Sequence, residues 1–329
     1  MIVVLRRPED EAELRKWVPP EAVFSHFHDN GQQVFILRGE GIPERLADQP
    51  WVERVLQLQG KYSLARKSYK AAGSVDLGPY RLGGERFMVI AGPCAVQGRK
   101  QLAGLCEVLA EVGVHALRGG AYKPRTSPYD FQGMGEEALL LMASARAQYG
   151  FPVVSEVMDP RQIDAMFPWV DCFQVGARNM QNFALLKALG QSGKTVMLKR
   201  GPAATVEEFL AAAEYLYSHG NPSIILCERG IRTFETSTRN TLDLNAVAVL
   251  KQETHLPVLV DPSHGTGRRD LVIPLSRAAA AVGADGIIVE ADLYPELAAS
   301  DGPQALTAPL LQTLMSELRV LLPALGRCL

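Results

Sequence analysis

The stretch FMVIAGP (87–93) is short and apolar, and it ends in small residues immediately before the lone cysteine Cys94. Seven further runs of this kind follow along the chain. Helix-like segments separate them, such as RKQLAGLCEVLAEV (99–112), with apolar residues at i, i+3 and i+4. The other seven runs occupy 114–121, 152–158, 172–178, 195–201, 223–230, 257–264 and 286–292.

Eight strands that alternate with helices predict an α/β protein with a (β/α)8 TIM barrel. A doubly wound open sheet is the structural alternative. The count of eight favours the barrel, as do the polar residues at the end of each run. None of the runs supplies the glycine-rich fingerprint of a dinucleotide-binding fold.

Residues 1–60 have a different pattern, in the order β-α-β-β-α-β, which predicts a small ferredoxin-like α+β domain. Within it, DNGQ (29–32) is a hairpin signal, because Asn-Gly suits the positive φ angles of a type I′ turn. Short helices are expected at 8–17 and 42–48. The predicted division is therefore a small domain over 1–60 and a barrel over 61–329, which includes a basic linker at 61–78.

The composition is that of an ordinary globular protein, with 329 residues, 47% hydrophobic and 21% charged. The net charge of −2 gives no reason to expect binding to nucleic acid or to a membrane surface. Five cysteines without a CxxC motif argue against a disulfide framework. The N-terminus has no signal-peptide pattern, and no apolar run is long enough to span a bilayer. We expect a soluble cytoplasmic protein.

Polar residues stand at the end of every predicted strand, which is the end where barrel active sites lie. They form two chemical groups. One sulfur, one imidazole and two carboxylates suit a single divalent ion such as Mn²⁺, Fe²⁺, Co²⁺ or Zn²⁺. Five cations suit a phosphorylated, carboxylated substrate. The first group is Cys94, His264, Glu290 and Asp301, and the second is Arg118, Lys123, Arg178, Lys199 and Arg229.

Each of these residues also has a plain structural interpretation. Cys94 alone is more simply a small buried residue, His264 could stabilise a turn, and Glu290 could pair with a nearby cation. What favours a functional site is the joint arrangement, since both groups follow the same ends of different strands. Glycine and proline before the cysteine are expected to turn an accessible, oxidation-prone thiolate toward the barrel mouth.

Several long motifs, in this order, resemble the 3-deoxy-D-arabino-heptulosonate 7-phosphate (DAHP) synthases of type I, in the subgroup with an N-terminal ferredoxin-like domain. The resemblance covers about residues 61–320. It is carried by AGPCAV, LRGGAYKPRTSPYDFQG, SEVMD, QVGARNMQN, LKRG, CERGIRTFE, TLDLNAV, VDPSHGTGRRD and EAD…SDGPQAL.

The resemblance implies a transferase that condenses phosphoenolpyruvate with D-erythrose 4-phosphate, the first step of the shikimate pathway. It implies the metal and cation groups given above, with Ala177 adding a backbone N–H to the phosphoenolpyruvate site. It assigns Arg125, Thr126 and Ser127 of KPRTS to erythrose 4-phosphate. The catalytic residues that we expect are Lys123 as proton donor, Glu156 as the group that orients water, and Cys94 and His264.

The same resemblance implies feedback inhibition by tyrosine or phenylalanine through the small domain, and a homotetramer or homodimer. The nearest rival is 3-deoxy-D-manno-octulosonate 8-phosphate (KDO8P) synthase, which uses arabinose 5-phosphate. That family carries a KANRSS-like stretch where this chain has KPRTS, and it lacks the small domain. More remote alternatives are a metal-dependent barrel aldolase and a non-catalytic barrel that binds metal and phosphate.

Overall fold

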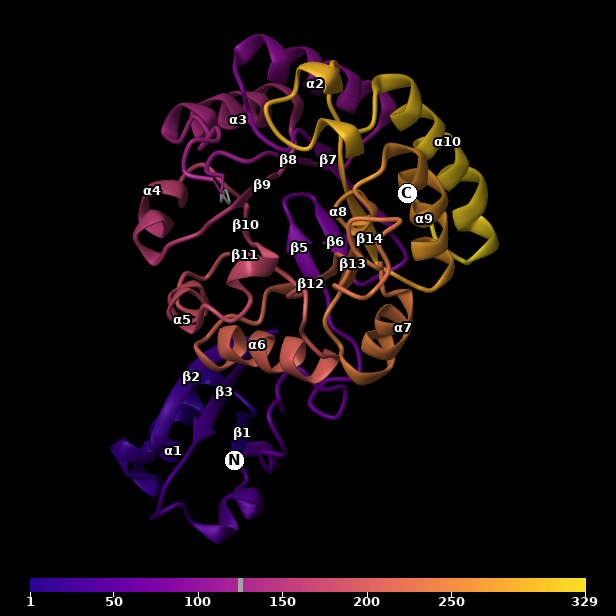
Figure 1. Cartoon of the computed structure of the whole chain (residues 1–329). Coiled ribbons are helices and arrows are strands. Elements are labelled where there is room, and N and C mark those ends of the chain that lie inside the picture. Colours follow the sequence, from indigo (N-terminus) through magenta and orange to yellow (C-terminus); the bar gives the residue numbers. More distant parts are fainter. Residues whose placement is uncertain (124–126) are drawn as a thin grey trace.

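The computed structural model describes residues 1–123 and 127–329. Eight parallel strands close into a barrel in chain order, so that the last strand pairs with the first (Figure 1). The predicted barrel is confirmed, and each predicted run contributes one strand. The strands are β7 (Met88–Gly92), β8 (Ala116–Arg118), β9 (Val153–Glu156), β10 (Cys172–Val175), β11 (Thr195–Lys199), β12 (Ile224–Glu228), β13 (Val258–Val260) and β14 (Gly286–Glu290).

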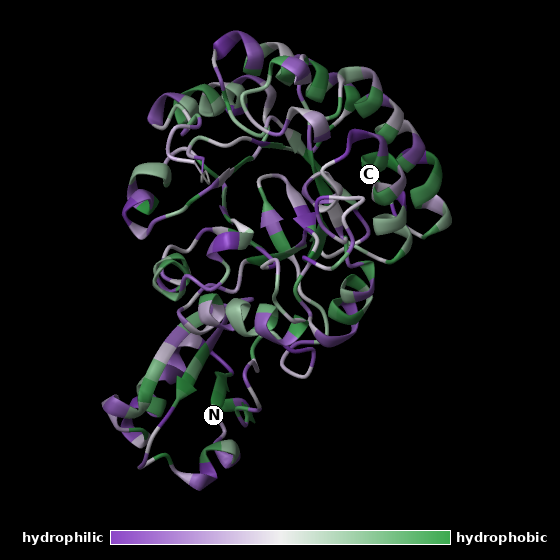
Figure 2. Ribbon diagram, viewed as in Figure 1, coloured by the Kyte–Doolittle hydropathy of each residue, from purple (hydrophilic) through white to green (hydrophobic). Residues whose placement is uncertain are grey.

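Helices surround the strands, and Figure 2 shows them in alternating green and purple, as expected for amphipathic segments. In β7, Met88 and Ile90 belong to the core inside the barrel, while Val89 and Ala91 belong to the core between strands and helices. No helix of the described part of the chain is long and apolar enough to cross a membrane. The barrel helices are α2 (Arg99–Val112), α3 (Glu136–Tyr149), α4 (Ile163–Met166), α5 (Phe183–Gly190), α6 (Val206–Ser218), α7 (Leu244–Glu253), α8 (Pro262–Thr266), α9 (Arg269–Ala281) and α10 (Ala308–Ala324).

An antiparallel hairpin closes the end of the barrel where the strands begin. It consists of β5 (Val75–Leu77) and β6 (Tyr80–Leu82), and its apolar side chains join the core inside the barrel (Figure 1). Thr195, the first residue of β11, donates a hydrogen bond to the carbonyl of Asp76 in the hairpin. Because apolar side chains fill this end, a polar site can form only at the opposite end, where the strands finish.

The small domain has the predicted ferredoxin-like order, with a four-stranded antiparallel sheet in the order β2-β3-β1-β4. Its second helix is a single 3₁₀ segment, η3 (Glu44–Asp48), where we expected a short helix at 42–48. Arg45 inside this segment has non-helical backbone angles (φ −90°, ψ 20°), so no continuous helix forms over 42–48. The other elements are β1 (Ile2–Leu5), α1 (Glu11–Trp17), β2 (Val23–Asp29), β3 (Gln32–Leu37) and β4 (Val52–Leu56).

The two central strands of the small sheet, β1 and β3, are buried on both faces, which explains why they are apolar. In β1, Val3 and Leu5 pack with Leu14 of α1, while Ile2 and Val4 join the apolar cluster that includes the barrel helices. Figure 1 shows the sheet lying beside α6. The two parts of the chain therefore share a continuous apolar contact.

The segment 61–78 that connects the two parts contacts the barrel along much of its length. Tyr62, Leu64 and Tyr69 are buried, and the last residues of the segment form β5. The carboxylate of Glu214 on α6 accepts hydrogen bonds from the backbone N–H groups of Leu64 and of the next residue, both at 3.0 Å. Side-chain packing and hydrogen bonds thus hold this segment against the barrel.

Candidate active site

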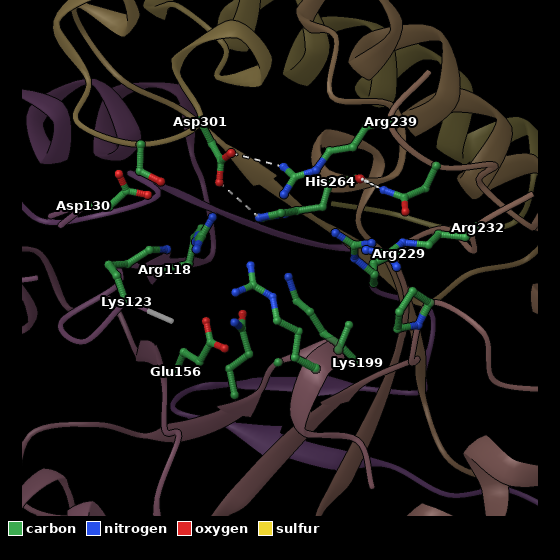
Figure 3. Close-up of a pocket in the computed structure, with 17 residues that line it drawn as sticks. Arg118, Lys123, Asp130, Glu156, Lys199, Arg229, Arg232, Arg239, His264 and Asp301 are labelled. Atoms are coloured by element: carbon green, nitrogen blue, oxygen red, sulfur yellow. Dashed lines mark hydrogen bonds and ion pairs between the residues drawn. The ribbon is translucent and has the colours of Figure 1, made fainter. Parts of the chain in front are cut away.

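A pocket of about 370 Å³ opens where the barrel strands end, and polar side chains from most of the strands line it (Figure 3). The predicted residues that line it are Arg118, Lys123, Glu156, Ala177, Arg178, Lys199, Arg229, His264 and Asp301. Among the described lining residues, seven are arginine or lysine and three are carboxylic acids. The wall of the pocket therefore carries an excess of positive charge.

Three of the four predicted metal ligands form a compact group. Ligand atoms of Cys94, Glu290 and Asp301 all lie within 4.8 Å of one another. Nε2 of the fourth, His264, lies 3.3 Å from Oε1 of Glu290 and 3.9 Å from Oδ2 of Asp301. The ends of β7, β13 and β14 bring these residues together, because barrel closure places β14 beside β7.

The orientation of His264 is set from behind by Asp261. Oδ2 of Asp261 lies 2.7 Å from Nδ1 of the imidazole, and Oδ1 accepts a hydrogen bond from the His264 backbone N–H. A carboxylate at Nδ1 favours the tautomer that carries its proton there and leaves the Nε2 lone pair facing the other ligands. Burial alone would raise the pKa of Asp261, but His264 and Lys199 hold it well below its usual value.

The donor set fits a divalent metal ion. It comprises a sulfur, an imidazole nitrogen and two carboxylates, a mixture suited to a borderline cation. Burial raises the pKa of both carboxyls, but neighbouring side chains bring both pKa values below their usual range. His264 and Arg118 lower the pKa of Glu290, and His264, the Cys94 thiol and Arg239 lower that of Asp301 to about 2.

The expectation of an accessible thiolate at Cys94 is wrong. The residue is 4% exposed, and burial together with the charge of Glu290 raises its pKa to about 12. Its thiol donates to Oδ2 of Asp301 over 3.1 Å, and Nζ of Lys123 lies 3.0 Å from the sulfur. The tight exit of β7 explains the burial, because a Cβ on Gly92 would lie 2.0 Å from a backbone oxygen of the neighbouring strand.

The cations differ in how they are partnered. Arg118 is 4% exposed and donates to Oε1 of Glu290 over 2.6 Å, while its buried Nε has no hydrogen-bond partner in the described part of the chain. Lys199 pairs with Asp261. Arg229 is partly buried, which lowers its pKa, and no carboxylate among the described residues forms an ion pair with it. Unsatisfied cationic donors in a concave site suit an anionic ligand.

Glu156 and Ala177 both line the pocket, and Glu156 lies on the wall opposite the metal-type group (Figure 3). The carboxylate of Glu156 packs against Gly176, where a Cβ would lie 2.0 Å from Oε1. Ala177 begins the short 3₁₀ segment η5 (Ala177–Asn179), which also carries Arg178.

The residues predicted for erythrose 4-phosphate are mostly outside the described part. Arg125 and Thr126 lie outside the described residues. Of the described residues in the loop that follows, Asp130 lines the pocket and Ser127 does not. Ser127 instead accepts a hydrogen bond from the backbone N–H of Tyr129.

The structure adds lining residues that sequence reasoning missed, namely Arg232, Arg239 and Asn240. All three lie in the loop between β12 and α7, after the last residue that we had selected on that strand. The signal was present, because this loop carries further basic residues beyond the strand end. By contrast, Arg200 at the end of β11 does not line the pocket and forms buried ion pairs with Glu228 and Asp243.

Comparisons with known proteins agree with this geometry. The model of the DAHP synthetase I family matches residues 77–322. A phospho-2-dehydro-3-deoxyheptonate aldolase from Thermotoga maritima is 47% identical over 334 residues, which covers 99% of each chain. The crystal structure of a phospho-2-dehydro-3-deoxyheptonate aldolase (DAHP synthase) from the same organism superposes with a TM-score of 0.80 at 46% identity. It covers 99% of this chain and 98% of the solved one.

A second class of relatives is more distant. A 2-dehydro-3-deoxyphosphooctonate aldolase from Bradyrhizobium diazoefficiens is 31% identical over 257 residues, covering 72% of this chain and 90% of the relative. The full-length match and the family model thus agree on one assignment. This chain belongs to the DAHP synthetase I family.

Proposed function

We propose that this chain is a DAHP synthase, which condenses phosphoenolpyruvate with D-erythrose 4-phosphate to DAHP and phosphate at the start of the shikimate pathway. The family assignment and the full-length relative support this activity. The observation that carries it is the metal-type group of Cys94, Glu290 and Asp301 directly beside the cations of the same mouth. A lyase that uses no phosphoenolpyruvate has no need of so many cations around one cavity.

Phosphoenolpyruvate, with its phosphate and carboxylate, would bind among the converging cations. Within residues 1–123 and 127–329, Nε of Arg118 has no hydrogen-bond partner and the guanidinium of Arg229 forms no ion pair, so an anion would satisfy both donors. Holding both anionic groups fixes the enol carbon in reach of the second substrate. The proposed ligands are Arg118, Lys123, Ala177, Arg178, Lys199 and Arg229.

Lys123 is proposed as the proton donor to the new alkoxide. Its Nζ lies 3.0 Å from the sulfur of Cys94 and 2.9 Å from the carbonyl oxygen of the same residue, and therefore at the border between the two groups of the site. A proton is needed where the aldehyde oxygen becomes an alkoxide, and a positioned ammonium supplies it. Glu156, on the opposite wall, would orient the water that adds to C2 of the enol. Lys199, Arg178 and Arg229 would stabilise the departing phosphate.

The proposed metal ligands are Cys94, His264, Glu290 and Asp301. The bound ion would act as a Lewis acid that polarises the aldehyde carbonyl. His264 is already oriented for this task by its contact with Asp261. For erythrose 4-phosphate we retain Arg125, Thr126 and Ser127 as proposed ligands.

The deciding experiment measures phosphate release from phosphoenolpyruvate with two aldehydes, erythrose 4-phosphate and arabinose 5-phosphate, with and without a chelator. We expect turnover with the four-carbon sugar only, abolished by chelation and restored by Mn²⁺. Preference for arabinose 5-phosphate would identify a KDO8P synthase instead. Absence of turnover with both sugars after metal is restored would favour the non-catalytic barrel.

For the small domain we propose a regulatory role, with tyrosine or phenylalanine as the effector, in a cytoplasmic homotetramer or homodimer. Its apolar contact with the barrel offers a route by which an effector could act on the catalytic part. Removing residues 1–60 should abolish inhibition by either amino acid while phosphate release continues. Inhibition that survives the deletion would place the effector site in the barrel.

A further inference from the structure

A second layer of side chains lies behind the metal-type group, and Arg239 is its centre. Nη1 of Arg239 donates to Oδ1 of Asp301 over 3.1 Å (Figure 3). The same atom lies 3.2 Å from Oε1 of Gln304. The other carboxylate oxygen, Oδ2, accepts from the Cys94 thiol. The arginine thus holds one oxygen of Asp301 and leaves the second facing the other ligands.

Gln304 extends the same layer to the second carboxylate. It is 2% exposed, and its Nε2 donates to Oε2 of Glu290 over 2.7 Å. Oε1 of Glu290 accepts from Arg118 on the other side. The guanidinium of Arg239 therefore contacts Asp301 directly, and it contacts Glu290 indirectly, through Gln304.

The loop that carries Arg239 is attached to the helix that carries His264. The backbone N–H of Arg239 donates to the carbonyl of Thr266, and the side chain of Asn240 donates to the carbonyl of His264 over 2.9 Å. Gly267 leaves little space, because a Cβ there would lie 2.7 Å from Cβ of Arg239. The position of the guanidinium is thus tied to the same helix as the histidine.

We propose that Arg239 is a positioning residue for the metal site, which orients Asp301 directly and Glu290 through Gln304. The inference rests on the proposed function, because it presumes that the four ligands hold a divalent ion. Side chains that hydrogen-bond to metal ligands fix their orientation, and losing one typically weakens metal binding by about 10- to 100-fold. Packing restrains Asp301 less than Glu290, since their side chains are 27% and 0% exposed, so hydrogen bonds contribute more to the orientation of Asp301.

Whether metal binding becomes weaker or stronger in a variant of Arg239 distinguishes a role in orienting the ligands from an effect of its charge alone. Removing a cation near a metal ion should by itself strengthen metal binding, because it removes repulsion. A weaker site in Arg239→Met would therefore require the loss of orientation to outweigh the gain from charge. Arg232→Met is the matched control, since Arg232 lies in the same loop and lines the same pocket but has no ion pair with a carboxylate among the described residues.

The experiment measures the Kd for Mn²⁺ of the metal-stripped, full-length protein by calorimetry. We expect the Kd to rise about 10- to 100-fold in Arg239→Met, to rise less in Arg239→Lys, and to stay equal or fall in Arg232→Met. Thermal unfolding of the metal-free variants checks that each is folded, and Arg239→Lys keeps the test available if the methionine variant is not.

Cys94→Ala in the same assay separates the two proposals. If it loses Mn²⁺ binding while Arg239→Met binds as tightly as wild type or more tightly, the positioning role is overturned and the metal site stands. If Cys94→Ala binds Mn²⁺ with wild-type affinity, the four-ligand site itself is refuted, and the positioning role with it.

Discussion

Two aspartates with lowered pKa values, buried Asp29 and partly buried Asp301, show the difference between a structural polar cluster and a candidate functional one. Asp29 lies at the contact between the small domain and the barrel, and Asp301 lies at the barrel mouth. For both, burial raises the pKa and hydrogen bonds and nearby cations lower it below its usual value. What distinguishes them is whether the surrounding charges are satisfied within the protein.

At the domain contact the polar groups satisfy one another. The hairpin turn at Asn30 carries Asp29 into the barrel surface, where its carboxylate accepts hydrogen bonds from Tyr69, Tyr217 and Lys70. Each donor comes from the protein, and the cluster needs no ligand. Such a closed arrangement explains stability and nothing more.

At the mouth the charges do not balance. Positive residues outnumber carboxylates around the pocket, Arg229 forms no ion pair among the described residues, and Nε of Arg118 is without a partner there. The excess costs free energy unless an anion binds, which is why we propose an anionic ligand at the mouth and none at the domain contact. Substitutions at the two places should therefore change different measurements, activity at the mouth and stability at the domain contact.

The largest effect is expected from Cys94→Ala. Removing the proposed sulfur ligand should lower metal-dependent kcat by more than the roughly 100-fold seen when only a supporting residue is lost. Phosphate release with saturating substrates and Mn²⁺ measures it. Full activity of this variant after extensive chelation would show that the cysteine is a packing residue, as Cys106 is on α2.

Lys123→Ala should follow, with kcat lowered by about 100-fold and the KM for phosphoenolpyruvate changed much less, since general acids contribute about 10²- to 10⁴-fold. Steady-state kinetics at varied phosphoenolpyruvate separates the two constants. A rise in KM with kcat unchanged would make Lys123 a binding residue only.

Arg229→Met should raise the KM for phosphoenolpyruvate by about 10- to 100-fold, which corresponds to losing a hydrogen bond to a charged group of roughly 1.5–3 kcal/mol. Lys61→Met is the matched control, because it removes one positive charge from an exposed pair with Glu207, and neither residue lines the pocket. Equal KM values in the two variants would contradict the assignment of Arg229 to the substrate.

The smallest change in activity is expected from Asp29→Asn, which should lower the free energy of unfolding by about 1–3 kcal/mol and leave kcat unaltered. Because the folded pKa of Asp29 lies below the unfolded value of about 3.9, its stabilisation is complete above that pH. This stabilisation is lost as the pH falls through the folded pKa of Asp29. The difference in free energy of unfolding between wild type and Asp29→Asn should therefore become smaller in that pH range.

Denaturant unfolding at several pH values measures this difference. The control is Asp48→Asn, an exposed aspartate of the same domain, for which we expect a change within about 0.5 kcal/mol. If the difference in free energy of unfolding between wild type and Asp29→Asn stays constant down to the lowest pH measured, the negative charge of Asp29 does not stabilise the contact between the hairpin and the barrel.

Much of the fold was predictable because it depends on local pattern. The run at 87–93 became β7, shorter by one residue at each end, and the Asn-Gly signal became the turn between β2 and β3. The helix expected at 42–48 is a 3₁₀ segment over Glu44–Asp48. The local sequence did not indicate that the backbone would leave the helical angles at Arg45. Likewise, only the tertiary structure shows that the hairpin at 75–82 closes the end of the barrel where the strands begin.

By itself the sequence determined which residue types stand at the strand ends, and hence that Cys94, His264, Glu290 and Asp301 could meet. For Cys94, His264 and Glu290 this follows because barrel closure places β14 between β13 and β7. Asp301 stands in the loop after β14, so its position also depends on how that loop folds. Tertiary structure alone decided how these groups are held. The burial of Cys94, the support of Asp301 by Arg239 and the lack of an ion pair for Arg229 among the described residues depend on distances between loops far apart in the chain. No periodicity along the sequence encodes such distances.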